Sequence, residues 1–145
     1  MIKVRDKKHL KEIIEKAPTN ADLNHLDVSN VTDMTSMFYN SQFNGDISGW
    51  DVSKVEYMNS MFQKSKFNGD ISGWDVSNIK DMSHMFYYSQ FNGDISGWDV
   101  SKVKNMWRTF YSSKLGESYH YILFRNKYER KDLFDRIFKE INPYD

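Results

Sequence analysis

Apolar and polar residues follow one another along this chain in an order that recurs every 24 residues. In one copy the apolar residues Val55, Met58, Met61 and Phe62 stand at i, i+3, i+6 and i+7. That spacing is typical of one face of a helix of about two turns. Ser53 precedes it as a candidate N-cap residue. The pattern therefore predicts a short helix in each copy of the repeat.

A glycine-containing segment separates these helical stripes. Residues 67–76 contain the β-favouring residues Ile71 and Val76 together with two glycines, which predicts one or two short extended segments. A repeated unit of extended segment, turn and short helix predicts parallel strands stacked at about 4.8 Å per coil. The expected fold class is α/β, in the form of a short solenoid of about 3.5 coils.

The residues before the repeats carry a different apolar pattern. Leu10, Ile13 and Ile14 share one face of a predicted amphipathic helix between Asp6 and Lys16, with Asp6 as its N-cap. The helix is expected to end before the proline that follows, because the residue before a proline disfavours helical conformation.

The residues after the repeats lose the pattern. Residues 118–124 (SYHYILF) are rich in β-forming residues, and residues 129–141 carry an apolar stripe with helical spacing. Repeat proteins need caps, because the stacking faces of their terminal repeats would otherwise be exposed. We expect a single domain, residues 1–145, with helical caps at 1–25 and 113–145 and repeats at 26–112.

One block of sequence is written three times. FNGDISGWD stands at Phe43–Asp51, Phe67–Asp75 and Phe91–Asp99, and it continues into phrases such as WDVSNIKDMSHMF from Trp74. Over Leu26–Phe110 these motifs resemble the repeat of the BspA-like leucine-rich-repeat family, which has related repeats in mycoplasma lipoproteins. The resemblance implies a leucine-rich-repeat-like solenoid, with a parallel sheet on one side and short helices on the other. It also implies protein binding, although fold analogy leaves the ligand and the location open.

Charge and cysteine content exclude several classes of function. Lys and Arg together number 20, as do Asp and Glu, so nothing favours nucleic acid or an anionic membrane as partner. Without cysteine the chain has no disulfide, no thiolate metal site and no thiol nucleophile. It shows neither a signal-peptide pattern nor an apolar run of the roughly 20 residues that span a membrane. We expect a cytoplasmic protein, or a cell-surface protein if the chain is a fragment.

Positions that are identical in every copy are explained by stacking. Trp50, Trp74 and Trp98 form one such row, which we expect in the core because aromatic side chains bury a large area. Rows of aspartate, such as the one containing Asp46 and Asp70, raise the question of a calcium site. Calcium β-rolls, however, repeat at about nine residues. We expect these carboxylates to accept hydrogen bonds from turn N–H groups, and we expect no metal or cofactor.

Positions that differ between copies carry the functional hypothesis. The four histidines and the serines show no spacing typical of catalysis, so we expect no enzyme activity. Variable positions are not needed for stacking, and several of them hold Trp, Tyr or Arg, the residues that dominate interface hot spots. The candidate partner-binding residues are Tyr57, Lys64, His84, Tyr88, Trp107 and Arg108.

The expected function is a non-enzymatic protein–protein interaction module that presents a rigid repeat surface. One version of this hypothesis is an inhibitor or mimic of another protein. A preformed surface loses little conformational entropy on binding. Two alternatives stay open: a structural repeat protein that assembles into a homo-oligomer, and a relative or fragment of a bacterial surface adhesin.

Overall fold

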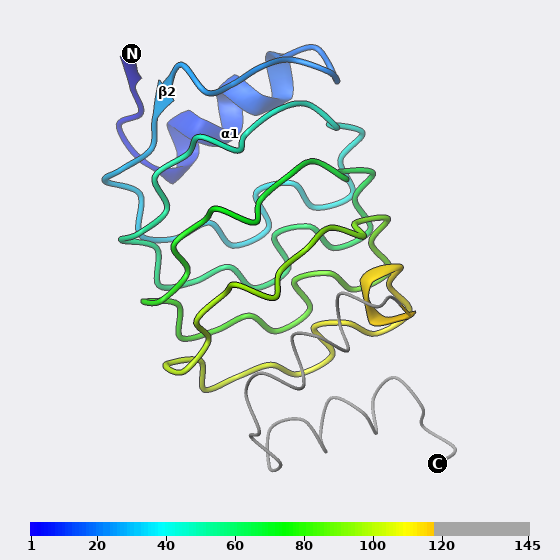
Figure 1. Ribbon diagram of the computed structural model, residues 1–145. Coiled ribbons are helices and arrows are strands. Elements are labelled where there is room, and N and C mark those ends of the chain that lie inside the picture. Colours follow the sequence, from blue (N-terminus) through cyan, green and yellow to red (C-terminus); the bar gives the residue numbers. More distant parts are fainter. Residues whose placement is uncertain (118–145) are drawn as a thin grey trace, which may run out of the picture.

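The computed structural model describes residues 1–117, in which the chain winds in successive rounds that lie one above the next (Figure 1). We refer to residues 2–25, 26–49, 50–73, 74–97 and 98–117 as coils 1 to 5. The predicted strand at 118–124 and the predicted helix at 129–141 lie outside the described residues. The elements are strand β1 (Ile2–Lys3), helix α1 (Lys7–Lys16), strand β2 (Leu26–Asp27) and the 3₁₀ helix η1 (Leu115–Glu117).

Backbone hydrogen bonds join each coil to the next. The amide of Met34 in coil 2 donates to the carbonyl oxygen of Tyr57 in coil 3 at 2.8 Å. The amide of Met58 in coil 3 donates to Asp81 in coil 4 at 3.0 Å in the same way. Parallel bridges at one position per coil therefore link Asp33, Tyr57, Asp81 and Asn105.

Coil 1 keeps this register although its sequence differs from the repeat. β1 pairs in parallel with β2, with Ile2 opposite Leu26, and an isolated parallel bridge joins Asp22 to Asp46. Between these two points α1 takes the place of the segment that forms turns in the other coils (Figure 1). The segment 1–25 thus contains a coil in register with the repeats, and only its helix departs from them.

The prediction of a short helix in each repeat is wrong, because α1 is the only α-helix in residues 1–117. In residues 34–41 the backbone amides alternate between two kinds of acceptor. Those of Ser36 and Phe38 donate to carbonyl groups of coil 3, whereas that of Met37 donates back to Met34 in its own coil. A helix needs all of these amides for bonds within one coil, so the bonds between coils exclude it.

A series of turns, rather than a helix, buries the apolar residues whose spacing predicted a helix. Val55, Met58, Met61 and Phe62 are all buried, because turns closed three residues back bring the chain to the core at the same intervals as a helix does. Ser53, the predicted N-cap, donates its hydroxyl to the carboxylate of the preceding aspartate at 2.6 Å.

Residues 67–76, which were predicted as one or two extended segments, form no strand. Turns lie within this segment and just beyond it, where the amides of Ser72 and Ser77 donate to the side chains of Asp70 and Asp75 at 2.9 and 3.0 Å. Glycine, serine and aspartate favour turns, and glycine and aspartate are also depleted in strands. The bridges of coils 3 and 4 lie in the other half of the repeat, which was predicted as helix.

Rows of identical side chains form the core. Trp50, Trp74 and Trp98 are buried, which confirms the prediction for this row. The indole N–H of Trp74 donates to the carbonyl oxygen of Ile47 in the coil before it at 3.1 Å. Phenylalanine rings of successive coils stack at centroid separations of 5.4, 5.8 and 6.1 Å along Phe38, Phe62, Phe86 and Phe110. Close packing of this kind gives the surface a rigid support.

Candidate functional site

The six candidate residues lie on one part of the repeat, which we call the turn segment: residues 57–64 in coil 3, 81–88 in coil 4 and 105–112 in coil 5. Three of them are large side chains with considerable exposure: 42% for Tyr57, 48% for Tyr88 and 45% for Trp107. Of the other candidates, the lysine is exposed, and the histidine and the arginine are half-buried. These candidate positions therefore face outward at least in part.

Four of the candidates have a left-handed backbone conformation. The angle φ is 55° at Lys64, 57° at His84, 53° at Tyr88 and 54° at Arg108. Each is the third residue of a turn closed by a backbone hydrogen bond, the position at which a type II turn requires positive φ. A non-glycine residue in this region costs about 1–2 kcal/mol, so the bonds between coils must hold it there. These side chains are therefore presented by a firmly held backbone.

Coils 4 and 5 bring several of these side chains into contact. The guanidinium carbon of Arg108 lies 5.3 Å from the ring centroids of both Trp107 and Tyr111, which is within cation–π range. Tyr87 stacks on Tyr111 at 5.4 Å and meets Tyr88 edge-on at 4.6 Å. The histidine of this segment meets Tyr87 edge-on at 5.3 Å. We call His84, Tyr87, Tyr88, Trp107, Arg108 and Tyr111 the aromatic patch.

Sequence reasoning missed two members of the aromatic patch, Tyr87 and Tyr111. Their column of the repeat varies as well, with Gln63 in coil 3, so comparison of the copies could have found them. Two predicted residues lie outside the ring contacts. Tyr57 belongs to coil 3, and Lys64 borders the aromatic patch because its amide donates to the carbonyl oxygen of Tyr87 at 2.8 Å.

Arg108 provides the permanent charge within the aromatic patch. Burial lowers the pKa of His84, and the charge of Arg108 lowers it further, although Asp81 has the opposite effect. The imidazole is therefore neutral at neutral pH. Just before the turn segment of coil 4, Lys80 and Glu56 form an ion pair at 2.6 Å. The hydrogen bond to Glu56 raises the pKa of Lys80, and the two charges compensate each other.

The aspartate rows lie in the other half of the repeat and form turns. Asp46 accepts hydrogen bonds from the amide of Ser48 at 2.9 Å and from its hydroxyl at 2.7 Å, and Asp70 and Ser72 form the same pair. This confirms the predicted role of these carboxylates in turns. The serine hydroxyl is the main cause that lowers the pKa of both aspartates. Within residues 1–117 no three His, Cys, Asp or Glu side chains are grouped so that they could hold a metal ion.

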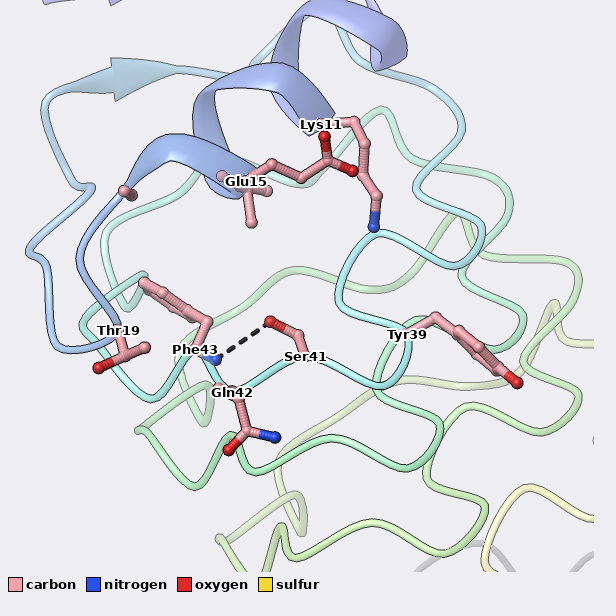
Figure 2. A pocket seen from close by; sticks show the side chains of 9 residues that line it. Lys11, Glu15, Thr19, Tyr39, Ser41, Gln42 and Phe43 are labelled. Atoms are coloured by element: carbon pink, nitrogen blue, oxygen red, sulfur yellow. Dashed lines mark hydrogen bonds between the residues drawn. The ribbon is translucent and has the colours of Figure 1, made fainter.

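A cavity of about 260 Å³ lies between α1 and coil 2 (Figure 2). Ile14 and Phe43 contribute its apolar surface, and the Ser41 hydroxyl accepts a hydrogen bond from the Phe43 amide at 3.0 Å. The ammonium group of Lys11 is engaged with backbone carbonyl oxygens of coil 2. Glu15 is the only carboxylate in the lining, which contains no histidine.

These features define a repeat protein in which a core of recurring residues carries a surface that differs from coil to coil. The sequence model of a family described as "Mycoplasma protein of unknown function, DUF285" matches residues 8–119. The chain therefore belongs to this family, which is compatible with the predicted resemblance to mycoplasma repeats. No curated protein and no solved structure matched the chain. In the described residues, no helix is both long and apolar enough to cross a membrane.

Proposed function

We propose that this protein is a non-enzymatic protein-interaction module that binds its partner through the aromatic patch. The observation that carries the proposal is the exposure of Trp107, at 45%, and of Tyr88, at 48%, on a firmly held backbone. Trp, Tyr and Arg are the residues most enriched among interface hot spots. Rings that are already ordered lose little conformational entropy when a partner binds.

Comparison of the coils supports binding over a purely structural role for these rings. The position of Trp107 is held by Thr35, Asn59 and Ser83 in coils 2 to 4, and those coils stack through the same backbone bonds. Stacking therefore does not require a large side chain at this position. An exposed indole also leaves much of its apolar surface in water, which is unfavourable in the unbound protein.

We also propose that the fold is a short leucine-rich-repeat-like solenoid related to the BspA-like repeats. Supporting observations are the parallel bridges at equivalent positions of coils 2 to 5 and the rows of stacked aromatic rings. In this view the identical residues are the scaffold, and the binding specificity resides in the turn segments, where the coils differ.

Affinity capture from cells of the source organism, followed by mass spectrometry and affinity measurement with the purified partner, tests the proposed function. We expect Trp107→Ala and Tyr88→Ala each to weaken binding at least tenfold, because removal of a hot-spot side chain costs about 2 kcal/mol or more. The matched control is Tyr39→Ala, which removes an exposed tyrosine from coil 2 and should change the affinity less than twofold.

Equal binding by all three variants and the wild type would rule out the aromatic patch as the interface. A concentration-dependent molar mass in light scattering that Trp107→Ala abolishes would instead favour a self-assembling protein. Near-ultraviolet circular dichroism of each variant establishes that the buried tryptophans keep their packing, so a loss of binding cannot be attributed to unfolding.

A further inference from the structure

Charge is distributed unevenly between the two halves of the repeat in coils 3 to 5. Residues 56–66, 80–90 and 104–114, which contain the turn segments, carry six basic and two acidic side chains, a net charge of +4. The remaining residues between 50 and 114 carry two basic and five acidic side chains, a net charge of −3. Within residues 50–114 the excess of positive charge is therefore confined to the part of the repeat that holds the aromatic patch.

Lys64 and Lys114 lie in the coils before and after that of Tyr88, and their backbone amides bond to the two chain neighbours of Tyr88. The amide of Lys64 donates to the carbonyl oxygen of Tyr87 at 2.8 Å, and the amide of Lys114 donates to that of Ser89 at 3.2 Å. Lys7 forms an ion pair with Asp33, and Lys80 forms one with Glu56. Neither Lys64 nor Lys114 forms an ion pair with an acidic side chain of residues 1–116.

We propose that the aromatic patch binds an acidic segment of a partner protein; this inference rests on the proposed function. Exposed rings offer apolar faces to one side chain of the segment, and Lys64 and Lys114 offer ammonium groups to carboxylates on either side of it. The two lysines lie two coils apart, a rise of roughly 10 Å along the stack at the spacing of stacked strands, and two positions apart within the repeat. An extended peptide covers that distance in about three residues. The recognised segment therefore has two acidic residues about three positions apart with an aromatic or large aliphatic residue between them.

Charge complementarity favours an acidic peptide over a nucleic acid. A phosphate backbone is bound along a continuous track of cations, whereas here the lysines stand at the border of a ring cluster. The net charge of −3 in the other half of the same coils opposes the wrapping of a long polyanion. A short segment with a few carboxylates meets the positive half alone and gains most from the surface potential at low salt.

Selection of a random displayed peptide library on the full chain tests the inference, with affinities then measured by fluorescence anisotropy for labelled synthetic copies of the enriched peptides. We expect the enriched peptides to carry Asp or Glu on both sides of an apolar residue and to bind more weakly as salt is raised. The double variant Lys64→Gln, Lys114→Gln should lose at least tenfold in affinity, and Trp107→Ala should do the same. The charge-matched control Lys54→Gln, Lys102→Gln removes two lysines from the other half of the repeat and should stay within twofold.

The outcomes separate this inference from the proposed function. The acidic-segment inference is overturned if the selected peptides depend on Trp107 but are not enriched in Asp or Glu. It is also overturned if they bind the two double lysine variants with equal affinity. In both cases the proposed protein-binding function is retained. If no peptide is selected, or if the selected peptides bind Trp107→Ala as tightly as the wild type, both proposals fail. Tighter binding of a single-stranded oligothymidylate than of any selected peptide overturns the inference in favour of nucleic acid.

Discussion

Gly45 lies where the backbone of coil 2 passes close to that of coil 1. A Cβ atom added to it would overlap the carbonyl oxygen of Ala21 and would lie 2.8 Å from the ring of Phe43. That carbonyl oxygen accepts the amide of Asp46 at 3.0 Å, so neither backbone can move away without loss of a bond between coils. We expect Gly45→Ala to lower the free energy of unfolding by about 3 kcal/mol, the upper end of the usual cost of overpacking.

Gly73 provides the matched control for this prediction. A Cβ atom at Gly73 meets no atom within 4 Å, and the residue does not have positive φ. Gly73→Ala should therefore leave the free energy of unfolding unchanged or raise it by about 0.5 kcal/mol, because alanine restricts the unfolded chain. Urea denaturation of both variants checks the pair. Similar values for the two would mean that the close approach at Gly45 does not contribute to stability.

Comparison of the copies predicts burial of single residues well and backbone conformation poorly. Trp74 was expected in the core because every complete copy holds tryptophan there, and it is buried. The left-handed positions gave no such signal. Lys64, Tyr88 and Arg108 share no chemistry that favours positive φ, which glycine and asparagine adopt most readily. Their conformation is imposed by bonds to the neighbouring coil, so local sequence does not report it.

At the level of elements, α1 protects one end of the stack. In coils 3 to 5, several carbonyl oxygens of the turn segment accept hydrogen bonds from backbone amides of the preceding coil. Coil 2 has carbonyl groups at the same positions. Beyond its first turn, the amides of α1 are used within the helix and cannot serve these carbonyls. The ammonium group of Lys11 takes their place at Met37, to whose carbonyl oxygen it donates at 3.0 Å. It also donates at 3.3 Å to the carbonyl oxygen of Ser36, which accepts the Tyr39 amide within its own coil.

Removal of this ammonium group should therefore destabilise the first two coils. We expect Lys11→Met, which keeps an apolar stem of similar length, to lower the free energy of unfolding by about 2 kcal/mol, the usual value of hydrogen bonds to a charged group. An edge that has lost this protection should also associate more readily. Chemical denaturation and light scattering over a range of concentrations measure the two effects.

Lys8→Met is the control, because it introduces the same side chain on α1 at an exposed position that makes no bond to coil 2. It should change the free energy of unfolding by less than about 0.5 kcal/mol. If both variants behave alike, the loss of charge or the added methionine explains the result, and Lys11 has no capping role.

α1 could be predicted from sequence and the turns of the repeats could not, for a physical reason. Asp6 accepts the amide of His9 at 2.8 Å, and Leu10 and Ile14 are buried, as the cap and the apolar stripe predict. All of these features act within ten residues. In the repeats the same i, i+3 spacing occurs, but the decisive hydrogen bonds run to residues in the next coil. Patterns read along a single segment do not contain that information.

For the molecule as a whole, the turns formed by aspartate and serine link stability to pH. Serine hydroxyls are the main cause that lowers the pKa of Asp27, Asp46, Asp51, Asp70 and Asp75, followed by the serine amides. A carboxylate with a lowered pKa in the folded state releases its proton more readily there than in the unfolded chain. The stabilisation is therefore complete above the ordinary value of 3.8 and is lost as the pH falls below it.

The serine hydroxyls should account for a large part of this acid sensitivity. We expect the triple variant Ser48→Ala, Ser53→Ala, Ser72→Ala to be less stable than the wild type at neutral pH and to lose less stability on transfer to about pH 3. The amide bonds to the same aspartates remain, so the turns themselves are retained. Urea denaturation at both pH values gives the difference for each protein.

A matched triple variant separates this effect from the general consequences of replacing serine. Ser36→Ala, Ser60→Ala, Ser112→Ala alters three serines that lie at left-handed turn positions and belong to the variable columns rather than to the aspartate turns. This control should keep the acid sensitivity of the wild type, because the carboxylates retain their hydroxyl donors. If the two triple variants lose equal stability between neutral pH and about pH 3, the pH dependence arises elsewhere in the molecule. Because the aspartate turns recur from coil to coil, a difference between the two variants would mean that acid weakens the stack along its length rather than at one site.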